Sequence, residues 1–296
     1  MSIFWSCLGS LLGGGLVDYA FDVILFTPII LGLLVIHTYI VDRYYSEQEQ
    51  QDEHYKLGKM IASKDFFGLW SDKQILLKLV LKAFFIPFMY EISLGGIERL
   101  LFAPKFDWML LVHYSFIFGI MFDVVIAFCG YIFATRLIDN QIVSVEDDWK
   151  GWFFCLICYP PFIFLLPVMF KVMESNVWGR TNVLDEFISV LIFIQACTWV
   201  IYWWSTVEFG LKFSNLTWRG LVSSGPYAWT KHPAYLSKNI YWWINVASYM
   251  FITNISFLEK AKIIGLMTLV SLFYYGRCKC EERHLLSFRE YQVYSA

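Results

Sequence analysis

The sequence predicts an all-α membrane protein, namely a polytopic transmembrane helical bundle of about seven spans followed by a C-terminal cytoplasmic helix. Of the 296 residues, 58% are hydrophobic and only 16% are charged, whereas soluble domains average about 25% charged residues. The apolar residues form long uninterrupted runs, and the charged residues gather in the segments between those runs. Together these features indicate a chain that crosses the bilayer repeatedly.

A helix needs roughly 20 apolar residues to cross a hydrocarbon core of about 30 Å, and seven runs are candidate spans by this measure. The last run is short, and we expect its helix to continue beyond the bilayer. A glycine-rich apolar stretch over residues 3–17 has no basic residue before it, unlike a signal peptide. We expect it to be an interfacial or re-entrant segment, or an extension of the first span. The predicted spans are 21–41, 75–94, 109–133, 151–170, 187–204, 235–255 and 263–276.

Lysine and arginine give the orientation, because they concentrate on the cytoplasmic side of membrane proteins. With the seven predicted spans, fourteen of these residues fall on one face and six on the other. The richer face includes segments 42–74 and 134–150 and the C-terminus. We therefore expect a multi-pass integral membrane protein whose C-terminus faces the cytoplasm.

Composition excludes several classes of protein. A net charge of −2 gives no basic surface for nucleic acid. Seven cysteines, an odd number lying mostly in apolar runs, argue against a disulfide framework. Cys155 and Cys158 have metal-ligand spacing but lack the second pair that a zinc site needs, and five scattered histidines exclude a histidine-rich di-iron site. Gly13-Gly14-Gly15 lacks the strand and helix of a nucleotide-binding loop. We predict no metal.

Polar residues outside the last third have ordinary structural interpretations. Segments 42–74 and 134–150 are expected to be solvated connections. Lys78 and Lys82, one helical turn apart near the start of the second span, are expected to extend to the headgroups.

Three further polar side chains lie in or near the spans. His37 and His113 are expected to be hydrogen-bonded structural histidines. Asp123 must face the bundle interior or a polar cavity, since an exposed charge at this depth is costly. The cluster Tyr202-Trp203-Trp204 suits either a lipid-facing access route or an interfacial aromatic belt.

Two polar motifs stand out in the last third. The segment from Gly225 to Tyr235 reads as a turn followed by a helix that begins near Pro233, because proline suits the first helical turn. This presents His232 and Tyr235 at the membrane surface. About 45 residues later, Arg277 and Glu281 are four apart and therefore share one face of a helix that leaves the seventh span. The topology places both motifs on the cytoplasmic side, at the two ends of one helical hairpin.

Together these motifs resemble the isoprenylcysteine carboxyl methyltransferase family and its bacterial relatives, which include phospholipid methyltransferases. The resemblance covers about residues 211–294. It rests on Leu221-Val222-Ser223, Gly225-Pro226-Tyr227, Lys231-His232-Pro233-Ala234-Tyr235, Arg277, Glu281-Glu282, Tyr291 and Tyr294.

The resemblance implies a methyl transfer from S-adenosylmethionine, bound without a soluble dinucleotide-type domain in a pocket that faces the cytoplasm. It divides the chain into N-terminal helices over 1–204 and a methyltransferase region over 205–296. Arg277 would bind the substrate and, with Glu281 and Glu282, form the catalytic set. The implied cofactor contacts are Gly220, Leu221, Val222, Tyr227, His232, Pro233, Ala234, Tyr235 and Glu281.

The implied acceptor is a lipid or lipid-modified molecule, and two chemistries stay open for it. A carboxylate of the isoprenylcysteine type needs no general base and is the preferred interpretation. An amine must lose a proton, for which Glu281 or Glu282 is the candidate base.

The sequence departs from the family pattern at three points. Lys231 stands where arginine is usual, the segment between Glu282 and Tyr291 is shorter than usual, and the usual basic tail is absent after Tyr294. Two other functions therefore stay open. One is a membrane NADPH-dependent sterol-type reductase, whose signature also includes histidine-proline-x-tyrosine. The other is a non-enzymatic transporter or scaffold on the same fold.

Overall fold

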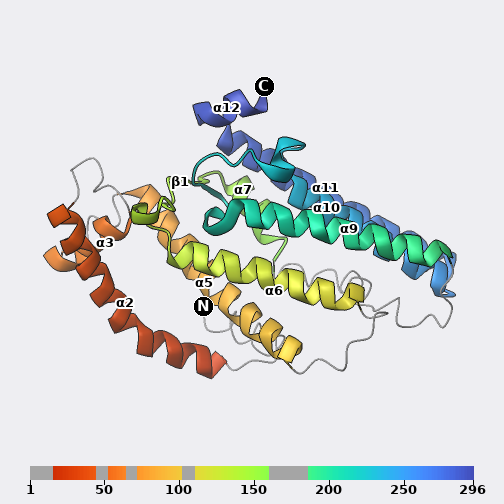
Figure 1. Cartoon of the computed structure of the whole chain (residues 1–296), viewed down its shortest axis with the longest axis horizontal. Coiled ribbons are helices and arrows are strands. Elements are labelled where there is room, and N and C mark those ends of the chain that lie inside the picture. The colour runs from red at the N-terminus through yellow and green to blue at the C-terminus, as the bar shows by residue number, and fades with distance from the viewer. Residues whose placement is uncertain (1–15, 45–52, 65–71, 102–110, 160–185) are drawn as a thin grey trace. The chain divides into compact units, whose positions relative to one another are not determined.

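The computed structural model describes residues 16–44, 53–64, 72–101, 111–159 and 186–296. These residues are helical apart from short turns and one pair of two-residue strands (Figure 1), which confirms the all-α class. The glycine run Gly13-Gly14-Gly15 and most of the predicted stretch 3–17 lie outside the described residues. The chain divides into two compact units: unit 1 comprises Met1–Gly95, Val124–Asp147 and Leu211–Gly220, and unit 2 comprises Gly96–Asp123, Asp148–Gly210 and Leu221–Ala296.

Unit 1 is built around helices α2 and α3, parts of α5 and α6, and a small strand pair. Its core includes the stacked rings of Phe85 and Tyr131, whose centroids lie 5.5 Å apart and whose planes differ by 7°. The Tyr131 hydroxyl accepts a hydrogen bond from the Asn215 backbone N–H at 2.8 Å, so the strand that follows Asn215 is held against this core. The elements are α2 (Leu16–Tyr44), α3 (Glu53–Ser63), the first part of α5 (Lys73–Leu101), the end of α6 (Leu111–Ile132), η2 (Arg136–Ile138), β1 (Ser144–Val145), most of η5 (Gly210–Lys212) and β2 (Thr217–Trp218).

The strand pair of unit 1 is antiparallel, with Ser144 opposite Trp218 and Val145 opposite Thr217. It is too short to alter the fold class. Its role is to place the residue after Trp218, Arg219, beside the end of α6, where the Arg219 side chain donates to the Gly130 carbonyl.

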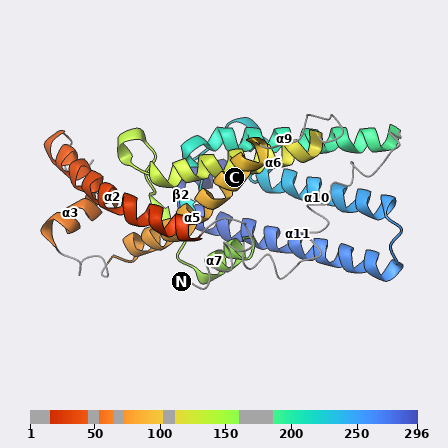
Figure 2. The ribbon, with the colours of Figure 1, turned by 90° about the horizontal axis from the view of Figure 1, so that it is seen from below.

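Unit 2 contains the long helices of the last third of the chain. Helix α10 packs between α9 and α11, and α11 also packs against α7. Figure 2 shows α10 and α11 side by side as the two arms of a hairpin, as the sequence predicted. Besides the last part of α5 and the first part of α6, its elements are α7 (Trp149–Leu156), α9 (Glu186–Phe209), η6 (Gly225–Ala228), α10 (Pro233–Ile252), α11 (Phe257–Leu285) and α12 (Arg289–Ser295).

Local sequence explains where the hairpin helices begin. Pro233 is the first residue of α10, as predicted, and its fixed φ suits that position. Helix α11 begins after Ser256, whose hydroxyl accepts from the Glu259 backbone N–H at 3.3 Å, while the Glu259 carboxylate accepts from the Ser256 backbone N–H at 3.0 Å. This reciprocal capping satisfies two backbone donors at the helix start.

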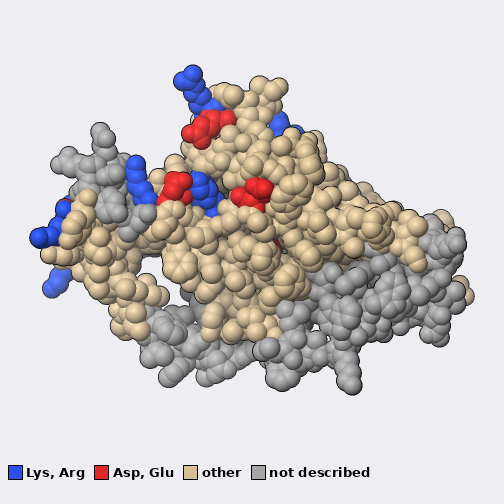
Figure 3. Space-filling view, in the orientation of Figure 1, with Lys and Arg blue, Asp and Glu red and all other residues tan. Residues whose placement is uncertain are grey.

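Helix α9 turns polar side chains inward and apolar side chains outward. Gln195, Ser205 and Thr206 are fully buried, whereas Phe193 and Val200 are 69% and 56% exposed. Figure 3 shows few charged side chains over this helix on the face in view. Such an arrangement is the reverse of a water-soluble helix and suits lipid, where polar groups face the bundle interior.

The seven predicted spans are only partly represented in the described residues. By length and composition, one helix of the described part of the chain, Ser189–Lys212, qualifies as a membrane span. The predicted span 263–276 lies within the 29-residue helix α11. This helix continues past residue 276, as expected. The predicted span 151–170 is helical only to Leu156 and then turns, and its remainder from residue 160 lies outside the described residues.

Two expectations about the polar connections are wrong. Lys78 and Lys82 are not free side chains that extend towards lipid, because both ammonium groups pair with the carboxylate of Glu53 on α3. Glu53 is only 3% exposed, so α3, which lies within segment 42–74, packs against other helices of unit 1. Segment 134–150 is likewise not fully solvated, since Glu146 is 6% exposed. The sequence reads as solvated in both places because the burying partners are distant in the chain.

The structure confirms the expectations for His37 and Asp123. His37 Nε2 lies 3.1 Å from the Thr135 hydroxyl, which confirms a hydrogen-bonded role. Asp123 accepts a hydrogen bond from Thr206 at 3.2 Å and is turned into unit 2, as expected. The side chain of His113 lies outside what the structure describes.

Candidate functional site

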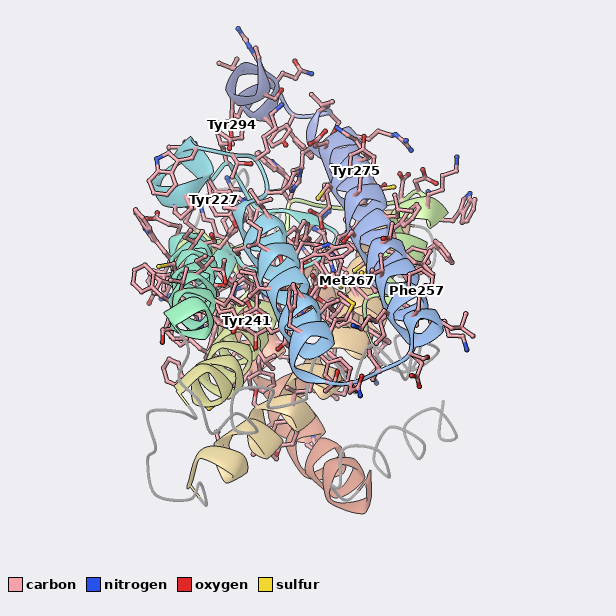
Figure 4. All side chains as sticks on the ribbon, turned by 90° about the vertical axis from the view of Figure 1, so that its right-hand side faces the viewer. Tyr227, Tyr241, Phe257, Met267, Tyr275 and Tyr294 are labelled. Carbon is pink, nitrogen blue, oxygen red and sulfur yellow. The ribbon has the colours of Figure 1, made fainter. Side chains whose placement is uncertain are left out.

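The two sequence motifs meet where α10 begins and α11 ends. His232 is the residue immediately before α10, and Tyr235 lies in the first turn of that helix. Arg277 and Glu281 lie one turn apart near the end of α11. Because α10 and α11 run antiparallel, the start of one helix lies beside the end of the other, at the end of the hairpin that carries the labelled Tyr227 and Tyr294 (Figure 4).

The carboxylate of Glu281 is the centre of this cluster. Its Oε1 accepts hydrogen bonds from the Tyr235 hydroxyl at 2.5 Å and from Arg277 Nε at 3.2 Å. Its other oxygen lies 3.9 Å from His232 Nδ1. Arg277 is only 4% exposed, so Glu281 neutralises a buried cation while staying partly accessible itself. Such a charge-assisted arrangement fixes the positions of both side chains.

The neighbouring carboxylate, Glu282, has different partners. His232 Nε2 lies 3.2 Å from Glu282 Oε1, and Lys279 donates to Glu282 Oε2 at 2.8 Å. His232 is therefore placed between two carboxylates, one on each side of its ring. The pair Glu281 and Glu282 thus divides into one carboxylate held by a buried arginine and one held by an exposed lysine.

Aromatic rings surround the charged groups. The rings of His232 and Tyr235 are stacked, with centroids 5.7 Å apart and planes within 8°. Tyr274 meets the Tyr235 ring edge-on at 5.5 Å. The Arg277 guanidinium lies 4.9 Å from the centroid of Tyr235 and 5.6 Å from that of Tyr159. The site thus offers both flat apolar faces and π-faces suited to a cation.

Two hydrogen bonds attach the C-terminal helix α12 to the first motif. The Tyr294 hydroxyl donates to the Tyr227 carbonyl at 2.5 Å. Lys231 Nζ donates to the Ser295 carbonyl at 3.0 Å. Lysine at position 231 therefore retains a role as a single-point donor, for which bidentate arginine geometry is unnecessary.

Burial and neighbouring charges both shift pKa values at the site. For Glu282, partial burial alone would raise the pKa, but the hydrogen bond from Lys279 and the charge of His232 outweigh burial, and the net result is a lowered pKa. Burial raises the pKa of Tyr227 well above its ordinary value, and the nearby Glu281 carboxylate raises it further. Glu282 therefore stays ionised and Tyr227 neutral at physiological pH.

The structure brings most of the predicted residues together, although their roles stay predictions. His232, Tyr235, Arg277, Glu281 and Glu282 are in direct contact, as described above. The other implied cofactor contacts lie in the preceding segment or the same helical turn. Pro233, Ala234 and Tyr227 are buried, and Leu221 and Val222 are half-buried. Gly220 is the last residue of unit 1, and its positive φ of 104° is a conformation that glycine adopts readily.

Three residues that contact the cluster were not predicted from the sequence. Lys279 and Tyr274 each lie three residues from a predicted site residue on α11, so helical spacing could have indicated both. Tyr159 lies more than a hundred residues from Arg277 in the chain, and no local signal connects them.

A second polar group lies deeper in unit 2. Lys238 Nζ on α10 is 4.0 Å from Asp123 Oδ2 on α6 and 4.5 Å from the centroid of the Tyr202 ring on α9. Thr206 completes the group by donating to Asp123. Tyr202 is 2% exposed, so this member of the tyrosine-tryptophan cluster belongs to the core, whereas Trp204 is 41% exposed.

Comparison with known proteins gives one match. No curated protein and no solved structure matches the chain. Residues 187–287 match the model of the isoprenylcysteine carboxyl methyltransferase (ICMT) family. They extend from α9 to just past the end of α11 and contain the contact cluster on α10 and α11. The resemblance seen in the sequence is thereby confirmed.

Proposed function

We propose that this protein is an integral membrane methyltransferase that uses S-adenosylmethionine and acts on a lipid or lipid-modified acceptor. The observation that carries the proposal is the Glu281 carboxylate, held between Tyr235 on one helix and Arg277 on the other. This contact joins the two motifs of the resemblance into one site. The family match over both helices supports the same conclusion.

The residue types of the cluster fit the proposed cofactor. S-adenosylmethionine carries an adenine ring, a sulfonium cation, an ammonium group and ribose hydroxyls, and it supplies an electrophilic methyl group. The stacked rings of His232 and Tyr235 offer an apolar face to adenine and a π-face to a cation. The Glu281 carboxylate can accept hydrogen bonds from the ribose hydroxyls or from the ammonium group. Tyr227, Leu221, Val222 and the backbone at Pro233 and Ala234 would complete the binding surface.

For the acceptor we propose a carboxylate. Arg277 is a buried cation with tyrosine rings on its flanks, which suits an anionic group that leaves water as it binds. A carboxylate is already deprotonated and needs no general base, so the protein contributes alignment and exclusion of water. With an amine acceptor, Glu281 or Glu282 would be the candidate base that removes the proton.

The first experiment tests the cofactor. Purified full-length protein in detergent is titrated with S-adenosylhomocysteine and, separately, with NADPH, and the melting temperature is followed. We expect stabilisation by S-adenosylhomocysteine, and loss of that stabilisation in Glu281→Gln and His232→Ala. Arg283→Gln is the control, since Arg283 lies on the same helix but forms an exposed ion pair with Asp148. Stabilisation by NADPH alone would overturn the proposal in favour of a reductase. A melting temperature that neither ligand changes would favour a scaffold.

The second experiment tests the acceptor. Membranes are incubated with methyl-tritiated S-adenosylmethionine and the protein, and base-labile counts report a methyl ester. For Arg277→Lys we expect KM for the acceptor to rise about tenfold, because a lost charge-assisted bidentate pair costs roughly 1.5–3 kcal/mol. The affinity for S-adenosylhomocysteine should change little. Base-stable counts in an amine-containing lipid would refute the carboxylate while leaving the methyltransferase proposal intact.

A further inference from the structure

Unit 1 contains a buried arginine that uses only part of its hydrogen-bonding capacity. Arg219 is 5% exposed. Its Nη1 donates to the Gly130 carbonyl at 2.7 Å and to Asn140 Oδ1 at 3.2 Å. Its Nε and Nη2 are buried and have no hydrogen-bond partner among the described residues. These two nitrogens form the edge of the guanidinium that recognises a carboxylate or phosphate through two parallel hydrogen bonds.

The charge of Arg219 is also poorly compensated. Within the described part of the chain, no carboxylate oxygen lies within the 4.0 Å of an ion pair with Arg219. Its guanidinium carbon lies 5.5 Å from the centroid of the Tyr131 ring. Burial lowers the pKa of Arg219 to about 10. A buried cation without an anion is costly, so a bound anion would stabilise this arrangement.

The neighbouring charges make the imbalance larger. Glu53 is the carboxylate that interacts electrostatically with Arg219, but Glu53 already pairs with Lys78 at 3.7 Å and with Lys82 more closely. Lys82 in turn interacts unfavourably with Arg219. Asp72 also acts electrostatically on Lys78, but it forms its own pair with Lys56 at 3.8 Å. Among the described residues of this group, three buried or nearly buried cations thus share one carboxylate.

We propose that Arg219, together with the charge of Lys82 on α5, binds a phosphate group at a site built from residues of unit 1. A phosphate supplies the several oxygen acceptors and the negative charge that Nε, Nη2 and the excess of cations lack. The residues come from the end of α6, from α5 and from the segment after β2, all within unit 1. The phosphate comes from one of two sources, the headgroup of an anionic membrane lipid or a free inorganic anion.

The topology expected from the sequence favours the lipid. Arg219 belongs to the face that is rich in lysine and arginine, and Lys78 and Lys82 lie near the start of a predicted span. This is the depth at which headgroup phosphates lie, on the leaflet where anionic lipids meet basic residues. Binding there would anchor unit 1 to the cytoplasmic surface.

The test uses full-length protein purified in a neutral detergent. Melting temperature and native mass spectrometry are recorded with phosphatidylglycerol, with phosphatidylcholine and with inorganic phosphate. We expect phosphatidylglycerol to bind and to raise the melting temperature, with a weaker effect of phosphatidylcholine. If inorganic phosphate alone reproduces the full effect, the site takes a free anion, and the phosphate assignment still holds. If neither phosphatidylglycerol nor inorganic phosphate binds, the unpartnered nitrogens are satisfied by water and the proposal is wrong.

Substitutions locate the binding. Arg219→Gln should weaken phosphatidylglycerol at least about tenfold, since one charged hydrogen-bond pair contributes roughly 1.5–3 kcal/mol. Arg219→Lys retains the charge but not the two-point edge, and it should show an intermediate loss even if Arg219→Gln does not fold. The control is Lys73→Gln, which removes an exposed cation from the same helix as Lys82. Equal lipid binding in Arg219→Lys, Lys73→Gln and the unmodified protein would overturn the assignment.

Discussion

At the scale of single residues, the two adjacent glutamates of α11 are in contrasting environments. Glu281 accepts from a buried tyrosine hydroxyl and a buried arginine, whereas Glu282 accepts from an exposed lysine. Two carboxylates placed side by side but held by different partners are suited to different tasks. In the proposed enzyme, Glu281 positions the cofactor and Arg277, and Glu282 controls His232.

Glu282 gives a pH-dependent prediction. Its pKa in the folded protein lies below the ordinary value of 4.5, so the folded state favours the ionised form. Its contribution to stability is therefore fully present above about pH 4.5 and is lost as the pH falls through the lower folded pKa. We expect the melting temperature of the unmodified protein to exceed that of Glu282→Gln by a constant amount between about pH 5 and 6, and the difference to shrink below about pH 4. A difference that grows on acidification would contradict the assigned partners.

Part of the site could be predicted from residues alone. The four-residue spacing of Arg277 and Glu281 is enough to predict their contact, because it follows from helix geometry. The contact of His232 with Glu282 spans fifty positions and needed the hairpin as an intermediate. The ion pairs of Lys78 and Lys82 were not predicted, because their partner, Glu53, lies in a run of polar residues that is typical of a solvated connection.

At the scale of elements, helix α11 depends on a glycine for its packing against α7. A Cβ atom at Gly276 would lie 2.5 Å from the Phe154 ring, so either this ring or the helices that carry the two residues must shift. We expect Gly276→Ala to destabilise the protein by about 1–3 kcal/mol, the usual cost of overpacking. The shift would also disturb the adjacent Arg277 and hence ligand binding.

The same helix provides a matched control for this prediction. A Cβ atom at Gly265 meets nothing within 4 Å, and alanine favours helix over glycine by roughly 1 kcal/mol. Gly265→Ala should therefore be neutral or stabilising in chemical denaturation followed by circular dichroism. Equal behaviour of the two variants would mean that α7 does not pack on α11 in solution.

Element boundaries were predictable where a capping residue or proline marks them. Pro233 fixes the start of α10, and Ser256 with Glu259 fixes the start of α11. The extent of α7 was not predictable, because an apolar run does not reveal where a helix turns. Helix α3 was also missed as a packed element. It packs against α2, where Gly58 lies close to Thr38, and the sequence does not show which helix a polar segment will contact.

At the scale of the whole molecule, the membrane assignment depends on which side chains face outward. The inward polar face of α9 is an arrangement that composition alone does not reveal. Helix α11 has 29 residues and is therefore about 43 Å long, more than the roughly 30 Å hydrocarbon core. In the proposed membrane-spanning hairpin, this excess length would leave the charged residues after Arg277 outside the bilayer.

The orientation of the hairpin can be tested with introduced cysteines. Lys262 and Glu290 are both exposed and lie at opposite ends of the α10–α11 hairpin and its C-terminal extension. With the seven native cysteines changed to alanine, a membrane-impermeant maleimide should label Glu290→Cys in inside-out vesicles and Lys262→Cys in right-side-out vesicles. Labelling of both from the same side would refute a hairpin that crosses the membrane.

The attachment of α12 has a practical consequence. The bonds from Tyr294 to Tyr227 and from Lys231 to Ser295 bring the last two residues before Ala296 onto the turn that carries the first motif. Any polypeptide fused after Ala296 would therefore begin beside the proposed cofactor site and compete with these bonds. Affinity tags for purification and binding measurements belong at the N-terminus of this protein.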